Sequence, residues 1–293
     1  MYLNSGPGEA HDFPSSRGAL GYARRMNRSA LLALCIFASA CTLTQRRDTE
    51  KVIAQSLISD DQEFQLGLQV HEQLKKDNTK FLENPTVELY VESLARKMIA
   101  EANKERKLDW KWFVIDDPAT VNAFATPGGR IYVYTGLLLA AENEAEVIGV
   151  LGHEIGHVVG RHSARQLVAS NGLQVVVDMA LGKNGGEVAK LAAGLAGKGA
   201  QLAYGRDMEL EADQYGARYA SGAGYDPRGL ATFFEKLKAK YGDTGPVMTF
   251  FSTHPANSDR ITKVTELIAA ENLQGTELGV TSLKAAQAAL GKK

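Results

Sequence analysis

Hydrophobic residues recur with the period of an α-helix over two long stretches in the first half of the chain. Between residues 60 and 76 they stand among charged positions. Between residues 84 and 103 they fall on one face, formed by Val87, Tyr90, Val91, Leu94 and Met98. The period predicts two amphipathic helices, and Pro85 favours the start of the second. We expect His71, in the first helix, to be a solvated residue and not a metal ligand.

Short runs of β-branched and aromatic residues come next. Residues 109–118 predict one strand, and Arg130–Tyr134 predict another, entered through a turn at Pro127, Gly128 and Gly129. We expect these strands to form a small antiparallel sheet beside a binding cleft.

The rest of the chain is predicted to be helical. The segment 142–168 has the strongest helical pattern, and further helices are expected at 207–222, 229–241 and 259–272. Residues 170–205 suggest two loosely packed helices, in which Asp178, Lys190 and Lys198 argue against a membrane span. The last 20 or so residues suggest a loosely attached tail. The predicted fold class is therefore α+β, mainly α.

The N-terminal segment predicts export. Arg24, Arg25 and Arg28 precede an apolar run at 30–40, which is the length of a signal-peptide core and too short to span a bilayer. Small residues lead directly into Cys41, as in a bacterial lipobox, so we expect Cys41 to be lipidated. A plain secretory signal with an incidental cysteine is the alternative. Because Thr42 and not Asp follows Cys41, the resulting anchor is expected in the outer membrane, facing the periplasm.

Four segments follow from this interpretation. They are an N-terminal extension and lipoprotein signal peptide (1–40), a tether (41–59), a folded domain that contains the candidate chemistry (60–270) and a C-terminal tail (271–293). Translation starts at Met1 or at Met26, which also suits a signal peptide. Lys+Arg 33 against Asp+Glu 34 gives a net charge of −1, which does not favour a nucleic-acid partner.

The segment "LGHEIGHVVGRHSARQ" contains the candidate chemistry. His153 and His157 are four residues apart on a predicted helix, so their rings lie about 40° apart around its axis and can reach one ion. Glu154 stands beside the first histidine, where it can act on a metal-bound water as a general base. This is the HExxH arrangement of zinc peptidases.

The third ligand has to come from another position. His162 would point about 180° away from His153 if the helix continued, and Glu146 would lie about 10 Å along the axis. The segment "RDMELEADQYGARYA" offers Glu209 and Asp213 on one helix face, with Glu211 pointing away. A helix laid across the first could give Glu209 to the metal and Asp213 to a ligand imidazole N–H.

Four segments together resemble the HtpX and CAAX-prenyl-protease type of zinc metallopeptidases: "NAFATPGGRIYVYTGLL", "ENEAEVIGVLGHEIGHVVGRH", "ELEAD" and "STHPANSDRI". The resemblance covers residues from about 60 to 270 and implies a gluzincin that binds one Zn²⁺ per chain, with Glu209 as third ligand. The chain lacks the transmembrane helices of the multi-span members. It is similar to the soluble, lipid-anchored periplasmic branch, which is associated with outer-membrane protein quality control.

The resemblance also implies roles for His254 and Arg260, at family positions near the cleft. They are candidates for stabilising the tetrahedral oxyanion, and His254 is alternatively a cap on the metal that keeps the enzyme latent. By similarity to related peptidases, an edge strand is expected to pair with the substrate backbone through Gly129, Arg130, Ile131, Tyr132 and Val133.

The expected function is a zinc metalloendopeptidase that cleaves unfolded or misfolded envelope polypeptides, with the outer-membrane assembly machinery as a possible partner. The alternative is a chaperone or assembly factor for outer-membrane proteins in which proteolysis is secondary. A structural zinc protein is a third interpretation, which the intact Glu154 disfavours.

Overall fold

A computed structural model describes residues 49, 51–52, 54, 56–169, 204–242, 244–255 and 258–291. The chain divides into two units, Met1–Thr49 and Glu50–Lys293, and the description below concerns the second. The predicted signal peptide, Cys41 and most of the tether lie outside the described residues. So do the two helices expected within 170–205, apart from the last two positions.

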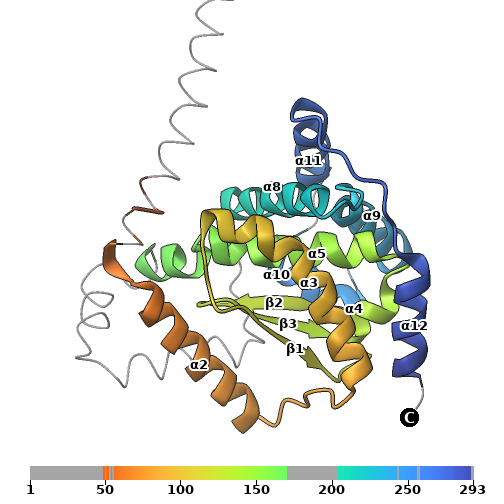
Figure 1. Ribbon diagram of the computed structural model, residues 1–293, viewed down its shortest axis with the longest axis horizontal. Helices are drawn as coiled ribbons and strands as arrows, with labels where there is room; N and C mark the ends of the chain where they lie inside the picture. Colours follow the sequence, from red (N-terminus) through yellow and green to blue (C-terminus); the bar gives the residue numbers. More distant parts are fainter. Residues whose placement is uncertain are drawn as a thin grey trace, which may run out of the picture. The chain divides into compact units, whose positions relative to one another are not determined.

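The described part of the second unit combines a small sheet with helices (Figure 1). In chain order these elements are α2 (Asp60–Lys76), α3 (Pro85–Glu105), β1 (Lys111–Ile115), β2 (Ala123–Thr126), β3 (Arg130–Tyr134), α4 (Thr135–Ala140), α5 (Glu144–Val159), α8 (Arg206–Gly222), α9 (Gly229–Tyr241), η1 (Gly245–Val247), α10 (Met248–Thr253), α11 (Ser258–Ala270) and α12 (Val280–Leu290). Residues 162–169 are also helical. The predicted α+β class, mainly α, is confirmed.

The sheet has the strand order β1-β3-β2. The two predicted strands, β1 and β3, pair in parallel, and β2, which was not predicted, pairs with β3 in the antiparallel sense. The sheet is therefore mixed, and the prediction of a purely antiparallel sheet is wrong. The sequence pattern indicated β1 and β3, whereas β2, which lies on the other side of β3 from β1, was not predicted.

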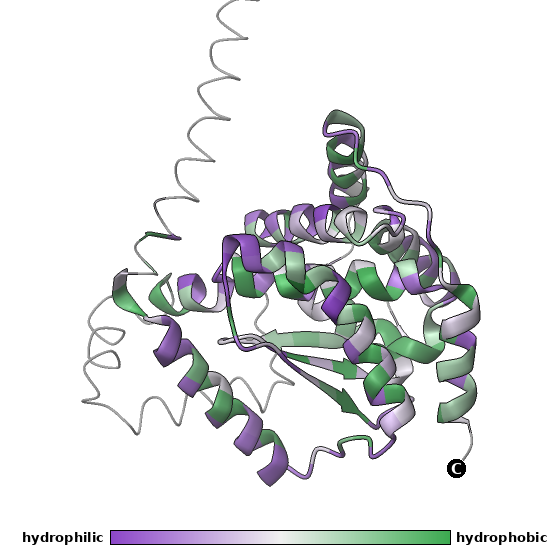
Figure 2. Cartoon of the chain, in the orientation of Figure 1, coloured by the Kyte–Doolittle hydropathy of each residue, from purple (hydrophilic) through white to green (hydrophobic). Residues whose placement is uncertain are grey.

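Helix α5 is the centre of the unit, and all sixteen of its residues are buried. Figure 2 shows apolar colouring over most of α5 and the strands, whereas polar and apolar residues alternate along α2 and α8. Helix α5 packs most extensively on α8, and it also contacts α9 and β2. A Cβ built on Gly152 would lie 3.0 Å from the Cα of Gly216, so these two glycines let α5 and α8 approach closely.

Helix α2 begins with a complete capping box, in which Ser59 and Gln62 satisfy each other's backbone N–H groups. Its apolar face forms a second core cluster with the sheet, which includes Leu66, Val70 and Tyr132. His71 lies within this cluster, with Nδ1 3.1 Å from the hydroxyl of Tyr132. The expectation that His71 is solvated is wrong, because aromatic side chains of the sheet cover that face of the helix.

The C-terminal segment is held more firmly than the sequence suggested. Leu283 and Ala286 of α12 are buried, and α12 contacts α3, α4 and α5. The side-chain amide of Gln287 donates to the carbonyls of Leu138 and Ala141. The expected loose attachment is therefore wrong for α12, while the four segment boundaries stay predictions. In the described part of the chain, no helix has the length and apolar character needed to cross a membrane.

Candidate metal centre

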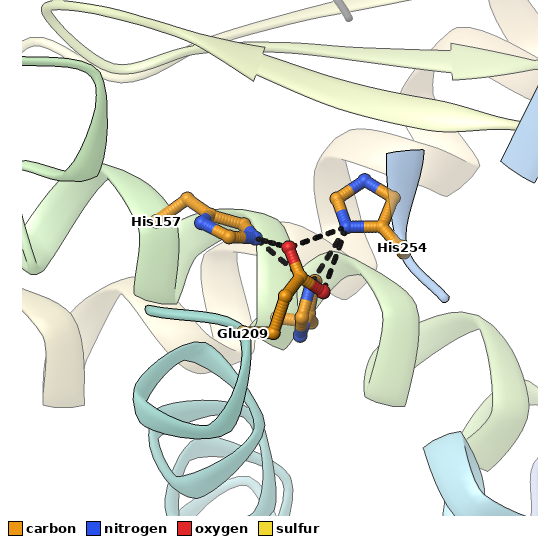
Figure 3. Close-up of side chains that lie close together, drawn as sticks. His157, Glu209 and His254 are labelled. Atoms are coloured by element: carbon orange, nitrogen blue, oxygen red, sulfur yellow. Dashed lines mark hydrogen bonds and ion pairs between the residues drawn. The ribbon is translucent and has the colours of Figure 1, made fainter. Parts of the chain in front are cut away.

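Four side chains from three parts of the chain converge at the contact between α5 and α8. His153 and His157 come from α5, Glu209 from the first turn of α8, and His254 from the residue after α10. All four are buried, and one ligand atom from each lies within 4.8 Å of the others. Figure 3 shows the carboxylate of Glu209 between the rings of His157 and His254.

The separations between these atoms fit a small tetrahedral metal ion. The Nε2 atoms of His153 and His157 are 2.9 Å apart, and they lie 3.5 and 3.4 Å from the two oxygens of Glu209. The Nδ1 of His254 lies 3.1 Å from Nε2 of His153 and 3.2 Å from the Glu209 carboxylate. Ligands at about 2.0–2.1 Å from a tetrahedral ion are separated by roughly 3.3 Å. Two or three imidazoles with one carboxylate also form a donor set that suits zinc.

His153 is oriented by Asp213, one turn further along α8 than Glu209. The Nδ1–H of His153 donates to Oδ1 of Asp213 over 2.8 Å, which leaves Nε2 facing the other ligands. Burial opposes a charged ring, but the hydrogen bonds to Asp213 and Glu209 outweigh it and raise the pKa of His153 to about 9. The structure thus brings Asp213 to the position predicted for it.

Arg260 lies against the acids of α8. Its Nε and Nη2 donate to the two oxygens of Asp213 over 2.7 and 2.6 Å, and Nη1 lies 2.8 Å from Glu209. Burial alone would raise the pKa of Asp213, but the charge and hydrogen bonds of Arg260 lower it below its usual value. The contacts indicate that Arg260 holds the two carboxylates in place. Its expected contact with an oxyanion stays a prediction.

Glu154 faces Nε2 of His254, whereas His153, His157 and Glu209 surround its Nδ1. Its Oε1 is 3.3 Å from Nε2 of His254, and its carboxylate also accepts a hydrogen bond from the backbone of Ala125. Burial raises the pKa of Glu154 above its usual value, although the nearby His254 opposes this. A carboxylate with a raised pKa is suited to take up a proton near neutral pH.

His157 contacts a residue whose position the sequence did not reveal. Its Nδ1 lies 2.8 Å from Nδ1 of His162, which is fully buried. Burial lowers the pKa of His162 to about 4 despite the neighbouring Glu211, so this ring is neutral near pH 7. The ring of Tyr204 stacks on the other side of His157, with centroids 4.1 Å apart. His162 is not in the ligand group, as expected, but it is a neighbour of that group.

Strand β3 is the central strand, so the residues expected at an edge are not at one. Arg130, Ile131, Tyr132 and Val133 pair with both β1 and β2, and the carbonyl of Gly129 accepts from Lys111. The prediction that these residues form an edge strand is wrong. The edge next to α5 is β2.

The backbone of β2 directs alternate groups to the side away from β3. Tyr134 donates to the carbonyl of Asn122, so bonded and non-bonded pairs alternate from that point. Phe124 and Thr126 therefore bond to β3, whereas Ala123 and Ala125 direct their N–H and C=O groups outward. The hydrogen bond from Ala125 to Glu154 shows that this outward side faces the candidate site.

Comparison with known proteins agrees with the geometry. Residues 85–268 match the sequence profile described as Peptidase family M48, which is more than half of the chain. "Mitochondrial metalloendopeptidase OMA1" of Schizosaccharomyces pombe is 36% identical over 186 residues, which are 62% of this chain and 53% of that protein. "Metalloprotease YcaL" of Escherichia coli is 32% identical over 167 residues, 56% of this chain and 63% of that protein.

A third relative is named for β-barrel assembly. "Beta-barrel assembly-enhancing protease" of Escherichia coli is 29% identical over 219 residues, 71% of this chain and 44% of that protein. The chain thus spans about half the length of the curated relatives that it matches.

Proposed function

The chain belongs to peptidase family M48, and on that premise we propose that it is a zinc metalloendopeptidase that cleaves unfolded or misassembled envelope proteins. The convergence of His153, His157 and Glu209 beside Glu154 carries the proposal. When bound at this site, zinc would lower the pKa of a coordinated water towards about 7 and polarise the scissile carbonyl.

The chain's own residues supply the remaining functions. Glu154 takes the proton of the attacking water and later passes it to the leaving amine. Asp213 holds His153 with Nε2 towards the ligand group, and Arg260 holds Asp213 and Glu209. Burial of all these groups excludes bulk water and strengthens their mutual interactions.

The substrate is proposed to be an extended polypeptide that pairs with the outer edge of β2. The outward N–H and C=O of Ala123 and the outward C=O of Ala125 are the pairing partners, because the N–H of Ala125 already bonds to Glu154. Pairing of this kind reads backbone more than side chains. It favours unfolded chains, because a folded protein rarely presents a free extended segment. This assignment replaces the pairing with β3.

His254 is proposed to hold the enzyme in a latent state. Its Nδ1 is the fourth member of the ligand group, and its Nε2 contacts Glu154. A fourth protein donor gives the closed coordination of structural zinc sites, whereas catalytic sites keep one position open. In this arrangement His254 fills the space of the reacting water and occupies the general base at the same time. Substrate binding has to displace it.

We further propose that Cys41 is lipidated and anchors the protein to the outer membrane, facing the periplasm. The name of the Escherichia coli assembly-enhancing protease supports an envelope role, and the lipobox-like sequence before Cys41 supports the anchor. Unfolded outer-membrane proteins are then the available substrates, and the assembly machinery is a possible partner.

Peptidase activity is tested directly with purified protein and unfolded casein. Wild type should bind one zinc per chain and cleave casein, and Glu154→Gln should keep the zinc and lose cleavage. Because Glu154 is not a ligand, a variant that loses both would indicate damage to the site rather than to the chemistry. If zinc-loaded wild type and zinc-loaded Glu154→Gln restore client assembly equally well, the result favours the chaperone alternative.

A further inference from the structure

The two histidines of α5 are held in different ways. The Nδ1 of His153 lies 2.8 Å from a carboxylate oxygen of Asp213. The Nδ1 of His157 lies 2.8 Å from another imidazole nitrogen, Nδ1 of His162. A metal-binding histidine needs a partner that fixes its tautomer and its ring orientation, and for His157 the structure offers His162 in that place.

The positions of the hydrogens follow from the contact. A histidine that binds a metal through Nε2 carries its hydrogen on Nδ1. His157 therefore donates through Nδ1 and His162 accepts through Nδ1, which places the hydrogen of His162 on Nε2. That nitrogen lies 3.4 Å from Oε2 of Glu211, close enough for an electrostatic contact although long for a hydrogen bond.

Glu211 is the carboxylate that ends the series of contacts from His157 through His162. Its Oε1 lies 2.5 Å from the ammonium of Lys51, and its Oε2 lies 2.8 Å from the guanidinium of Arg165. The carboxylate therefore stays an acceptor towards His162.

The turn after α5 brings the ring of His162 back against His157. The helix ends at Val159, and Arg161 adopts a left-handed conformation with φ of 54°. The guanidinium of Arg161 lies 2.8 Å from Glu63 of α2 and also contacts Asp60. A Cβ on Gly160 would lie 2.4 Å from Nε2 of His162, so only glycine leaves room for the ring.

We propose that His162 is a positioning residue for the metal site: its Nδ1 accepts the Nδ1–H of His157 and so directs the Nε2 lone pair of His157 at the metal. Glu211 acts through His162 and is not a ligand itself. The inference deepens the proposed function and rests on it, because it takes His157 Nε2 as a metal-binding atom.

Three variants of the full chain separate an acceptor from simple packing. His162→Phe keeps a ring without the acceptor, and His162→Asn replaces Nδ1 by an oxygen at the same distance from the backbone. Gly160→Ala leaves His162 intact but crowds its ring. His71→Phe is the matched control. His71 is also buried, and its ring bonds to the hydroxyl of Tyr132, but it lies at the core cluster between α2 and the sheet and not at the metal site.

Zinc affinity is measured by competition with a chelator, and the tautomer of His157 is followed in the metal-free protein by ¹H–¹⁵N correlation of the imidazole nitrogens. His162→Phe should weaken zinc binding by about 10- to 100-fold, the usual effect of removing a partner of a metal ligand. His162→Asn should recover most of this loss and retain the Nδ1–H tautomer. Gly160→Ala should weaken binding, and His71→Phe should not.

The outcomes distinguish this inference from the proposed function. If wild type binds no zinc, the proposed function fails. If wild type binds zinc and folded His162→Phe binds it equally well, the positioning role fails. Equal losses in His162→Phe and His162→Asn would show that packing, and not the acceptor, matters. Should His162→Phe fail to fold, the same decision rests on Gly160→Ala and on the tautomer and affinity of His162→Asn.

Discussion

Replacing His254 is the sharpest test of the latent arrangement, because the two roles considered for it predict opposite results. Its Nδ1 lies among the candidate ligand atoms, and its Nε2 is 3.3 Å from Glu154. His254→Ala removes both contacts and opens the fourth coordination position. A cap predicts that cleavage becomes faster, whereas a transition-state donor predicts that it becomes slower.

The size of the effect follows from the contact that has to break before substrate enters. A hydrogen bond to a charged group contributes about 1.5–3 kcal/mol, and this electrostatic contact of 3.3 Å, which is not a hydrogen bond, contributes no more than about the lower limit. Since about 1.4 kcal/mol corresponds to a factor of ten, we expect His254→Ala to cleave unfolded casein about tenfold faster. Zinc should at the same time bind more weakly, because one of four protein donors is gone.

The assay compares initial cleavage rates of zinc-saturated proteins, with metal content measured on the same samples. Thr253→Ala is the control, since Thr253 is the buried neighbour whose hydroxyl donates to the backbone carbonyls of Thr249 and Phe250 in α10. Its rate should match wild type. A fall in the rate of His254→Ala at full zinc occupancy would refute the cap and would support stabilisation of the transition state.

Three further predictions follow from the site and the sequence. Glu209→Gln should abolish tight zinc binding in a chelator competition, whereas Glu211→Gln should cause a much smaller loss; the reverse order would contradict the assignment of the ligand face of α8. Ala123→Pro removes one outward N–H at the start of β2, so its casein cleavage should fall severalfold at unchanged zinc content. Ala123→Ser is the control and should cleave casein at the wild-type rate. If Ala123→Pro also cleaves at the wild-type rate, pairing at this edge is excluded. Cys41→Ser should appear in the soluble periplasmic fraction or as an uncleaved precursor, and normal membrane fractionation of this variant would count against lipidation.

Spacing along helices was sufficient to predict much of the site. His153 and His157 share a face of α5, and Glu209 and Asp213 share a face of α8, because residues four apart on any α-helix do so. The structure adds the distance between the helices, which depends on the glycine contact between Gly152 and Gly216. The four-residue spacing does not contain that information.

Two features were beyond the reach of periodicity. The prediction for His162 assumed a continuing helix, but a left-handed Arg161 ends it, and residues far away in α2 hold that turn. The edge assignment of β3 rested on similarity to related peptidases, whereas β3 pairs with β1 on one side and with β2 on the other. In both cases long-range contacts determine the local geometry, and one sequence does not display them.

The three acids of the segment 209–213 show how one helix serves both histidines. Glu209 and Asp213 face α5, the first among the ligands and the second on His153. Glu211 points to another side of α8, yet it reaches His162 and Arg165 because the chain turns after α5 and runs on as the helix 162–169. The turn therefore lets α8 orient His157 indirectly as well as His153 directly. A displacement of α8 would disturb the ligand and both anchors at once, which fits the extensive packing of α5 on α8.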